Sequence, residues 1–332
     1  MNDKGLSVLD KYEFNLKKTG REKGAVLLDT DKGFFLLKEY NGSPQKLQFE
    51  NDLLKSLWEK YGIKGDYTLE NSNGELISDG EDGKSYIVKR WFKSRDMEQK
   101  NPKHIKSAGN MLGRLHKGLR NIGDLEVCTE NRISDMEQYF GQEFLRHNNE
   151  MRRTRNFIRQ KKRKNEFELM VLDSFDRFWE EGKKAEEEFY ALNMNEFIKK
   201  NCQKKALIHG AYNYHNLVFV GEEIIVTNYS KVKYGIQVRD LYDFMRKTLE
   251  KMGWDTKIGK SIIEEYQKNN VLSQEEKNYL LLKLCYPEKY WKILSHYNNT
   301  GKVWIPDKDV IKLKNTIAEA ENRKKFINSL LI

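Results

Sequence analysis

Two short segments hold polar residues at a spacing that suggests phosphate-transfer chemistry. They run from Ile208 to Asn216 (Ile-His-Gly-Ala-Tyr-Asn-Tyr-His-Asn) and from Ile225 to Ser230 (Ile-Val-Thr-Asn-Tyr-Ser). Enzymes that transfer phosphate from ATP to a hydroxyl use an Asp to accept the hydroxyl proton and an Asn five residues later to bind metal. A second Asp, beyond a short hairpin, holds Mg²⁺. The spacing therefore predicts the loop of such a site.

The acids that this chemistry needs are missing. Ala211 stands at the position of the proton acceptor, and Asn228 stands where the metal-binding Asp is expected, twelve residues after Asn216. A methyl group cannot accept a proton, and a neutral amide is a poor ligand for a hard dication. Ser230, where a further acid would be expected, adds no charge. The sequence thus predicts the frame of a phosphotransferase loop without its catalytic carboxylates.

Composition limits the class of protein. The 332 residues are 38% hydrophobic and 33% charged, with few Gly and Pro, which fits a folded chain of one large or two ordinary domains. The net charge of +10 favours anionic partners. No segment has the run of about 20 apolar residues that a bilayer span needs, and the first residues do not resemble an export signal. The three cysteines, Cys128, Cys202 and Cys285, are too far apart to indicate a disulfide framework or a zinc site.

Strand patterns dominate the first ninety residues. Segments 25–29 and 34–38 flank the turn residues of 30–33, which predicts a hairpin. Apolar residues at helical spacing predict a helix over 45–61, and 76–89 has the pattern of two further strands. This order is typical of the small lobe of a kinase-like fold, so we expect a β-rich N-lobe with one helix over residues 1–92.

Helical patterns dominate the remainder, 93–332. Helices are predicted over 102–116 and 166–190, and short strands return at 206–208, 217–220 and 224–227. The catalytic-type loop and hairpin at 206–230 therefore lie within a helical C-lobe. The predicted fold class is α+β, two-lobed and protein-kinase-like, of the aminoglycoside phosphotransferase type.

Several residues have a functional and an ordinary interpretation. Lys38 ends an apolar strand, where a kinase-like lobe presents its phosphate-binding lysine, and Glu50 on the next helix is its expected ion-pair partner. With 60 basic residues, however, a lysine at a strand end is also expected by chance. Residues 19–24 contain two glycines but lack the G-x-G-x-x-G pattern. His209 is more consistent with hydrogen bonding inside the loop than with metal binding.

A basic run covers residues 151–164, with eight Lys and Arg side chains and no acid. Its charged part, 152–164, must therefore face solvent or an anionic partner. It has no recognised nucleic-acid motif, and an acidic stretch, 166–188, follows it. Charge balance within the chain or docking of another protein is therefore favoured over nucleic acid.

The chain resembles the CotS-type spore coat proteins of endospore-forming Firmicutes, in the aminoglycoside phosphotransferase and choline kinase-like superfamily. The resemblance rests on His209-Gly210 with Asn216, on the segment Arg239–Lys247, and on Tyr286–Lys292 with Trp304-Ile305-Pro306. It covers most of the chain. It implies a two-lobed kinase-like fold, assembly in the mother-cell cytoplasm and then the spore coat, and other coat proteins as partners.

The resemblance also implies roles for single residues. Lys38 would contact phosphate with Glu50 as its partner, and Asn216 and Asn228 would be vestigial metal-side positions, with Ala211 at the degenerate base position. These positions form no complete metal site, although an active member of the superfamily would use ATP and Mg²⁺. Loss of a positioned base alone costs about two to four powers of ten in rate.

Three hypotheses remain open from the sequence. The leading one is a catalytically impaired, kinase-like scaffold of the spore coat. The alternatives are a residual ATP-dependent phosphotransferase acting on a small molecule or a coat protein, and a pseudoenzyme that binds nucleotide without consuming it.

Overall fold

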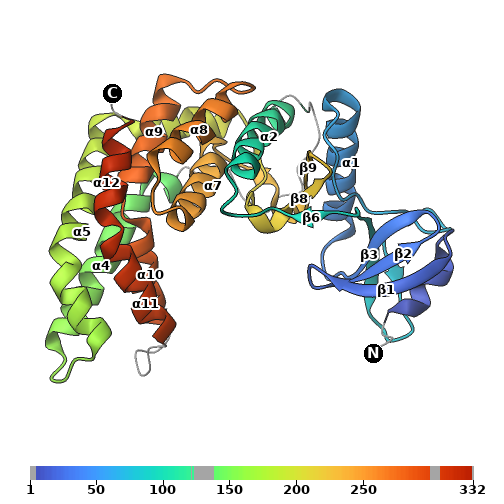
Figure 1. The fold of residues 1–332 in the computed structure, drawn as a ribbon, viewed down its shortest axis with the longest axis horizontal. Coiled ribbons are helices and arrows are strands. Elements are labelled where there is room, and N and C mark those ends of the chain that lie inside the picture. Colours follow the sequence, from blue (N-terminus) through green and yellow to red (C-terminus); the bar gives the residue numbers. More distant parts are fainter. Residues whose placement is uncertain (1–4, 121, 123–137, 300–306, 331–332) are drawn as a thin grey trace. The chain divides into compact units, whose positions relative to one another are not determined.

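The computed structural model describes residues 5–120, 122, 138–299 and 307–330. The chain divides into two compact units: Met1–Glu130 with Leu207–Tyr234, and Asn131–Ala206 with Gly235–Ile332. A small β-sheet part and a larger helical part confirm the predicted α+β fold class (Figure 1). The lobe boundary expected at residue 92 stays a prediction, since the first unit also contains the 206–230 hairpin. Cys128 and Trp304-Ile305-Pro306 lie outside the described residues.

Five antiparallel strands form the main sheet of the first unit, in the order β1-β2-β3-β5-β4. The strands are β1 (Leu16–Glu22), β2 (Ala25–Thr30), β3 (Gly33–Glu39), β4 (Ser78–Asp79) and β5 (Ser85–Arg90), after a 3₁₀ helix at Leu6–Lys11. The predicted β2–β3 hairpin is confirmed. Strand β1 escaped prediction because it is an edge strand whose side chains are mostly exposed, so it lacks an apolar alternation.

Helix α1 (Pro44–Tyr61) confirms the predicted helix and packs in the first unit. Its start is fixed by Ser43, whose hydroxyl accepts a hydrogen bond from the backbone N–H of Lys46, and by Pro44 in the first turn. Gly62 ends it in a left-handed conformation, with φ of 62°. The buried face carries Glu50 among its leucines, so a carboxylate is brought into the interior of this unit.

The elements around the loop belong to the same unit. They are α2 (Pro102–Arg120), the three-stranded sheet β6 (Arg95–Asp96), β8 (Leu217–Val220) and β9 (Glu223–Val226), and the pair β7 (Leu207–Ile208) and β10 (Lys233–Tyr234). The hairpin β8–β9 follows the first loop segment directly. The predicted strands near 206–208, 217–220 and 224–227 are therefore confirmed, and both polar segments lie at the ends of the same hairpin.

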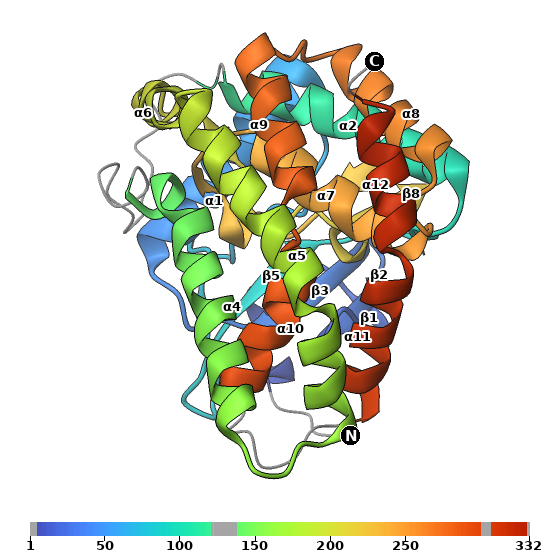
Figure 2. The same cartoon turned by 90° about the vertical axis from the view of Figure 1, so that its left-hand side faces the viewer.

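The second unit is helical. Its helices are α4 (Glu143–Gln160), α5 (Glu166–Ala191), α6 (Met194–Gln203), α7 (Val238–Lys251), α8 (Thr256–Gln267), α9 (Gln274–Cys285), α10 (Glu288–Asn299), α11 (Asp307–Ala318) and α12 (Ala320–Asn328). Helices α4, α5, α10 and α11 pack side by side (Figure 2). Capping boxes at Asn165 and Ser273 fix the starts of α5 and α9. None of the described helices is long and apolar enough to cross a membrane.

Candidate functional site

The buried side chain of His209 contacts the backbone of both polar segments. Its side chain is fully buried, its Nδ1 accepts a hydrogen bond from the backbone N–H of Ala211 at 3.3 Å, and its Nε2 lies 3.2 Å from the carbonyl oxygen of Thr227. Since Nδ1 is an acceptor, the tautomer with a proton on Nε2 satisfies both contacts. This histidine joins the two polar segments, which confirms its predicted structural role.

The two asparagines contact each other at the end of the hairpin. Asn228 Nδ2 donates to Asn216 Oδ1 at 3.3 Å, and Asn216 Nδ2 donates to the carbonyl oxygen of Ala211 at 2.8 Å. The other end of the Asn228 amide, Oδ1, accepts from the Ser230 hydroxyl at 2.7 Å. The structure thus brings the predicted vestigial positions Ala211, Asn216 and Asn228 together. The side-chain amides of the two asparagines are engaged in hydrogen bonds inside the loop.

Glu50 forms its ion pair with a different lysine from the one expected. Lys89 Nζ on β5 lies 3.9 Å from Glu50 Oε2 and 3.0 Å from Asp66 Oδ2. Lys38 is exposed near the end of β3, and it forms no ion pair within the described part of the chain. Leu36 pairs with Lys89 across β3 and β5, and Lys38 lies two residues after Leu36, so the two lysines lie on the same face of the sheet. On that face Lys89 is buried, whereas Lys38 is exposed.

Asp66 is a site residue that the sequence did not indicate. It is 4% exposed, and its Oδ1 accepts a hydrogen bond from the backbone N–H of Asn228 at 2.9 Å while Oδ2 faces Lys89. Asn228 has a positive φ of 63°, a conformation that asparagine tolerates better than most residues. Asp66 precedes a single bridge residue, Thr68, in a segment without periodicity, so no local pattern could have identified it.

The pKa of Glu50 predicts a pH-dependent stability. Burial raises the pKa of this carboxyl, and the nearby Lys89 opposes the shift only in part. The folded state therefore holds the proton more tightly than the unfolded chain does. The stability from this group is fully present below the ordinary glutamate pKa and is lost as pH rises through the raised pKa.

Glu50→Gln, which mimics the protonated form, should raise Tm near neutral pH by roughly 2 °C, and the difference should vanish in acid. Glu59→Gln, on the exposed side of α1, is the matched control and should leave Tm unchanged at every pH. Thermal denaturation followed by circular dichroism across pH measures both. A Glu50→Gln curve parallel to the wild-type curve would contradict the assignment.

A second charged cluster lies inside the helical unit. Arg239 makes two hydrogen bonds to Glu143, at 2.7 and 3.1 Å, and Lys283 Nζ lies 3.0 Å from Glu143 and 3.5 Å from Glu288. Burial alone would raise the pKa of Glu143, but the two cations hold it well below its usual range. Burial lowers the pKa of the neighbouring His147 to about 4, so this imidazole is neutral.

The same cluster has the geometry, but not the charge, of a metal site. Ligand atoms of Glu143, His147 and Glu288 lie within 4.8 Å of one another. Lys283 and Arg239 already neutralise both carboxylates, and a metal ion would have to displace a lysine that is 1% exposed. We therefore assign the cluster to stability of the helical unit and not to metal binding.

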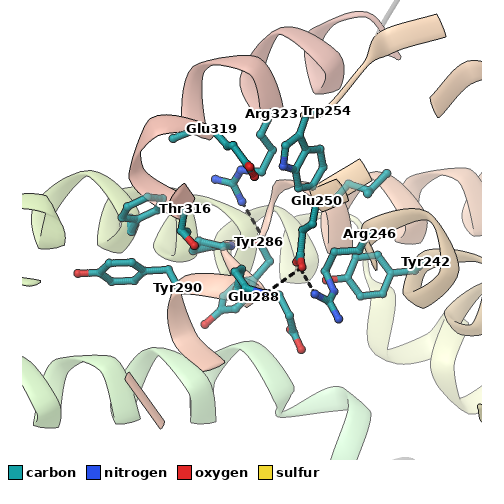
Figure 3. Close-up of a pocket in the computed structure, with 15 residues that line it drawn as sticks. Tyr242, Arg246, Glu250, Trp254, Tyr286, Glu288, Tyr290, Thr316, Glu319 and Arg323 are labelled. Atoms are coloured by element: carbon teal, nitrogen blue, oxygen red, sulfur yellow. Dashed lines mark hydrogen bonds and ion pairs between the residues drawn. The ribbon is translucent and has the colours of Figure 1, made fainter. Parts of the chain in front are cut away.

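A cavity of the helical unit borders this cluster (Figure 3). Charged side chains of both signs line it: Glu250 accepts from Arg246 and, at 3.0 Å, from Lys289, while Arg323 pairs with Glu181. Tyr286, Tyr290 and Trp254 supply the apolar walls. Most of these charges are paired, whereas Glu319 lines the cavity without an ion pair to any described residue, and burial raises its pKa.

Solved structures with a similar fold define the fold class of this chain. The fold matches that of an aminoglycoside phosphotransferase from Alicyclobacillus acidocaldarius with a TM-score of 0.86 and 15% identity, covering 98% of this chain and 94% of that one. It is also similar to an AMP-bound spectinomycin phosphotransferase, APH(9)-Ia, with a TM-score of 0.59, 14% identity and coverage of 95% and 96%. Amicoumacin kinase hAmiN gives a TM-score of 0.53 at 14% identity, with coverage of 98% and 93%. The chain thus has the protein-kinase-like fold of aminoglycoside phosphotransferases.

A match to a family model classifies the chain more narrowly than the similarity of its fold does. The model of the family described as spore coat putative kinase YutH matches residues 7–330, and the chain belongs to that family. A search of curated proteins gives no match. The predicted resemblance to spore coat proteins with a kinase-like fold is therefore confirmed, whereas identities of 14–15% to the solved enzymes show the fold and not the activity.

Proposed function

We propose that this protein is a non-catalytic, kinase-fold scaffold of the spore coat. The observation that carries the proposal is the loop itself. Ala211 offers a methyl group at the base position, and Asn216 and Asn228 hydrogen bond to each other and to the loop. Phosphoryl transfer depends on positioned groups that orient the nucleophile and hold metal. Without these carboxylates, the frame keeps its shape while the proton acceptor and the charged metal ligand are missing.

Packing next to the loop supports the same proposal. Leu36 and Ala25 on the main sheet form one buried cluster with Val218 and Ile225 on the β8–β9 hairpin, and Trp91 completes it. The exposed fractions in this cluster do not exceed 9%. Side chains thus fill the space where the sheet meets the hairpin, and this apolar contact stabilises the frame whether or not a ligand binds.

The surface proposed for coat attachment is the basic face of α4. We define it as the exposed residues Arg152, Arg153, Arg159, Lys162 and Arg163 on the helix and in the turn after it. Charge balance inside the chain uses only part of the basic run, since Arg155 pairs with Asp176 and Lys161 with Glu168. The five cations of the basic face have no ion pair with any described residue. We therefore expect an acidic segment of another coat protein as the partner, assembled from the mother-cell cytoplasm.

Charge reversal tests this surface. Arg152→Glu/Arg159→Glu/Arg163→Glu should reduce the amount of the protein in extracts of purified spore coats by roughly tenfold, because like charges now repel the acidic partner. The matched control reverses three exposed lysines elsewhere in the same unit, Lys257, Lys260 and Lys324, and should be retained like the wild type. Equal retention of both variants, with both folded, would show that the basic face is not the attachment surface.

Nucleotide binding without turnover is the second candidate. A groove of the first unit is lined by the cations Arg21, Lys23 and the exposed Lys38, together with the acids Glu22 and Glu39, and the cations would hold phosphate groups. In this case ATP should raise Tm, because a ligand that binds only the folded state stabilises it. A thermal-shift titration with ATP, with and without Mg²⁺, measures this. No shift at millimolar ATP would exclude this candidate.

A further inference from the structure

Lys89 is a buried cation that is linked to the loop through Asp66. Its side chain is 11% exposed, and its ammonium lies 3.0 Å from Asp66 and 3.9 Å from Glu50, which are both buried. The two acids come from different parts of the chain, Glu50 from α1 and Asp66 from the segment after it. Two buried carboxylates would repel each other without a cation between them.

Two further hydroxyls, those of Thr68 and Tyr229, are buried in the same unit, and neither has a hydrogen-bond partner among the described residues. Thr68 lies opposite Lys89 in an antiparallel bridge, so the two side chains share a face of the sheet. Burial, together with the nearby charge of Asp66, raises the pKa of Tyr229. Carboxylate and hydroxyl oxygens are the ligands that hard divalent cations prefer.

The cluster is connected to the loop through one residue. Asp66 uses one oxygen for Lys89 and the other for the backbone N–H of Asn228. Asn228 in turn donates to Asn216. The charge on Lys89 therefore fixes the carboxylate that holds the left-handed Asn228, at the position where an active phosphotransferase would carry a metal ligand.

We propose that the Lys89 ammonium is a built-in cation that takes the place of a divalent metal ion in this oxygen-rich cluster and keeps the loop in shape without metal. The proposal deepens the non-catalytic function and rests on it. It identifies the ligand that the cluster would take without the lysine: a hard divalent cation such as Mn²⁺ or Mg²⁺.

Removal of the lysine side chain tests this inference. In EDTA, Lys89→Ala should have a lower Tm than the wild type, because two buried carboxylates lose their partner. Saturating MnCl₂ should then raise its Tm by roughly 5 °C or more, while the wild type should show no Mn²⁺ response at equal ionic strength. The matched control is Lys89→Met, which fills the space without a charge and should not respond. Asp66→Asn in the Lys89→Ala background should abolish the response.

Each other outcome contradicts the inference. A Lys89→Ala protein that stays unfolded in saturating MnCl₂, or that folds but ignores the metal, shows that the cluster is not a cation site. A Mn²⁺ response of the wild type that Asp66→Asn removes shows that the lysine does not replace the metal. This thermal assay contains no nucleotide, so its outcome does not depend on phosphate transfer. Failure of the proposed function would be seen in a different measurement, the ATP consumption of the wild type.

Discussion

Glu143→Ala is expected to lower the free energy of unfolding by about 3–5 kcal/mol, the range for breaking a buried ion pair from one side. The substitution leaves the guanidinium of Arg239 and the ammonium of Lys283 facing each other inside the helical unit, where Lys283 is 1% exposed. Urea denaturation followed by circular dichroism measures the loss. The effect should be large because Lys283 is 1% exposed and Arg239 only 16% exposed, so water compensates little for the lost carboxylate.

Two comparisons make this prediction specific. Glu196→Ala removes an exposed carboxylate that lies 3.8 Å from Lys200 and should be close to neutral. In a double-mutant cycle, Glu143→Ala and Lys283→Met together should cost clearly less than the sum of the two single changes, because each alone strands the other's charge. Additive losses would show that Glu143 and Lys283 act independently, contrary to the buried network.

Gly210→Ala is expected to cost about 2–4 kcal/mol and to distort the loop. Gly210 has a φ of 71°, and a Cβ at this position would overlap the carbonyl oxygen of Lys231. Backbone strain and a clash with main-chain atoms therefore add, and the contacts of His209 with both polar segments should be disturbed. Urea denaturation gives the stability, and the histidine resonances in NMR spectra report on the loop.

Gly221→Ala separates strain from clash. Gly221 has a similar φ of 60° in the turn between β8 and β9, but no atom of the described residues lies within 4 Å of an added Cβ. It should cost only the strain, about 1–2 kcal/mol. If the two alanine variants were equally stable, the close approach of the loop to Lys231 would not constrain the protein, and the role of Gly210 would reduce to its φ.

The predictable parts of the fold are those that local sequence determines. The β2–β3 hairpin follows from its turn residues and α1 from its apolar spacing. The loop is predictable because a short hairpin fixes the spacing of its two polar segments. These signals extend over only a few residues, so the chain itself carries them.

The partners of buried charges could not be predicted in this way. Lys89 lies between Glu50 and Asp66, which come from separate parts of the chain, and Glu143 meets Arg239 and Lys283 from two other helices. Nothing local distinguishes Lys89 from the exposed Lys38, since both follow apolar residues in a strand. Both lie on the same face of the sheet, and only the tertiary contacts of Lys89 with Glu50 and Asp66 distinguish them.

Mg²⁺-dependent ATP consumption by the purified, unaltered protein decides whether the loop is catalytically inactive. We expect a rate equal to that of buffer and of a Lys38→Ala variant, because Ala211 supplies no base and Asn228 no charged metal ligand. Sustained consumption of ATP that requires Mg²⁺ and disappears in Lys38→Ala would contradict it, and would make the protein an active phosphotransferase.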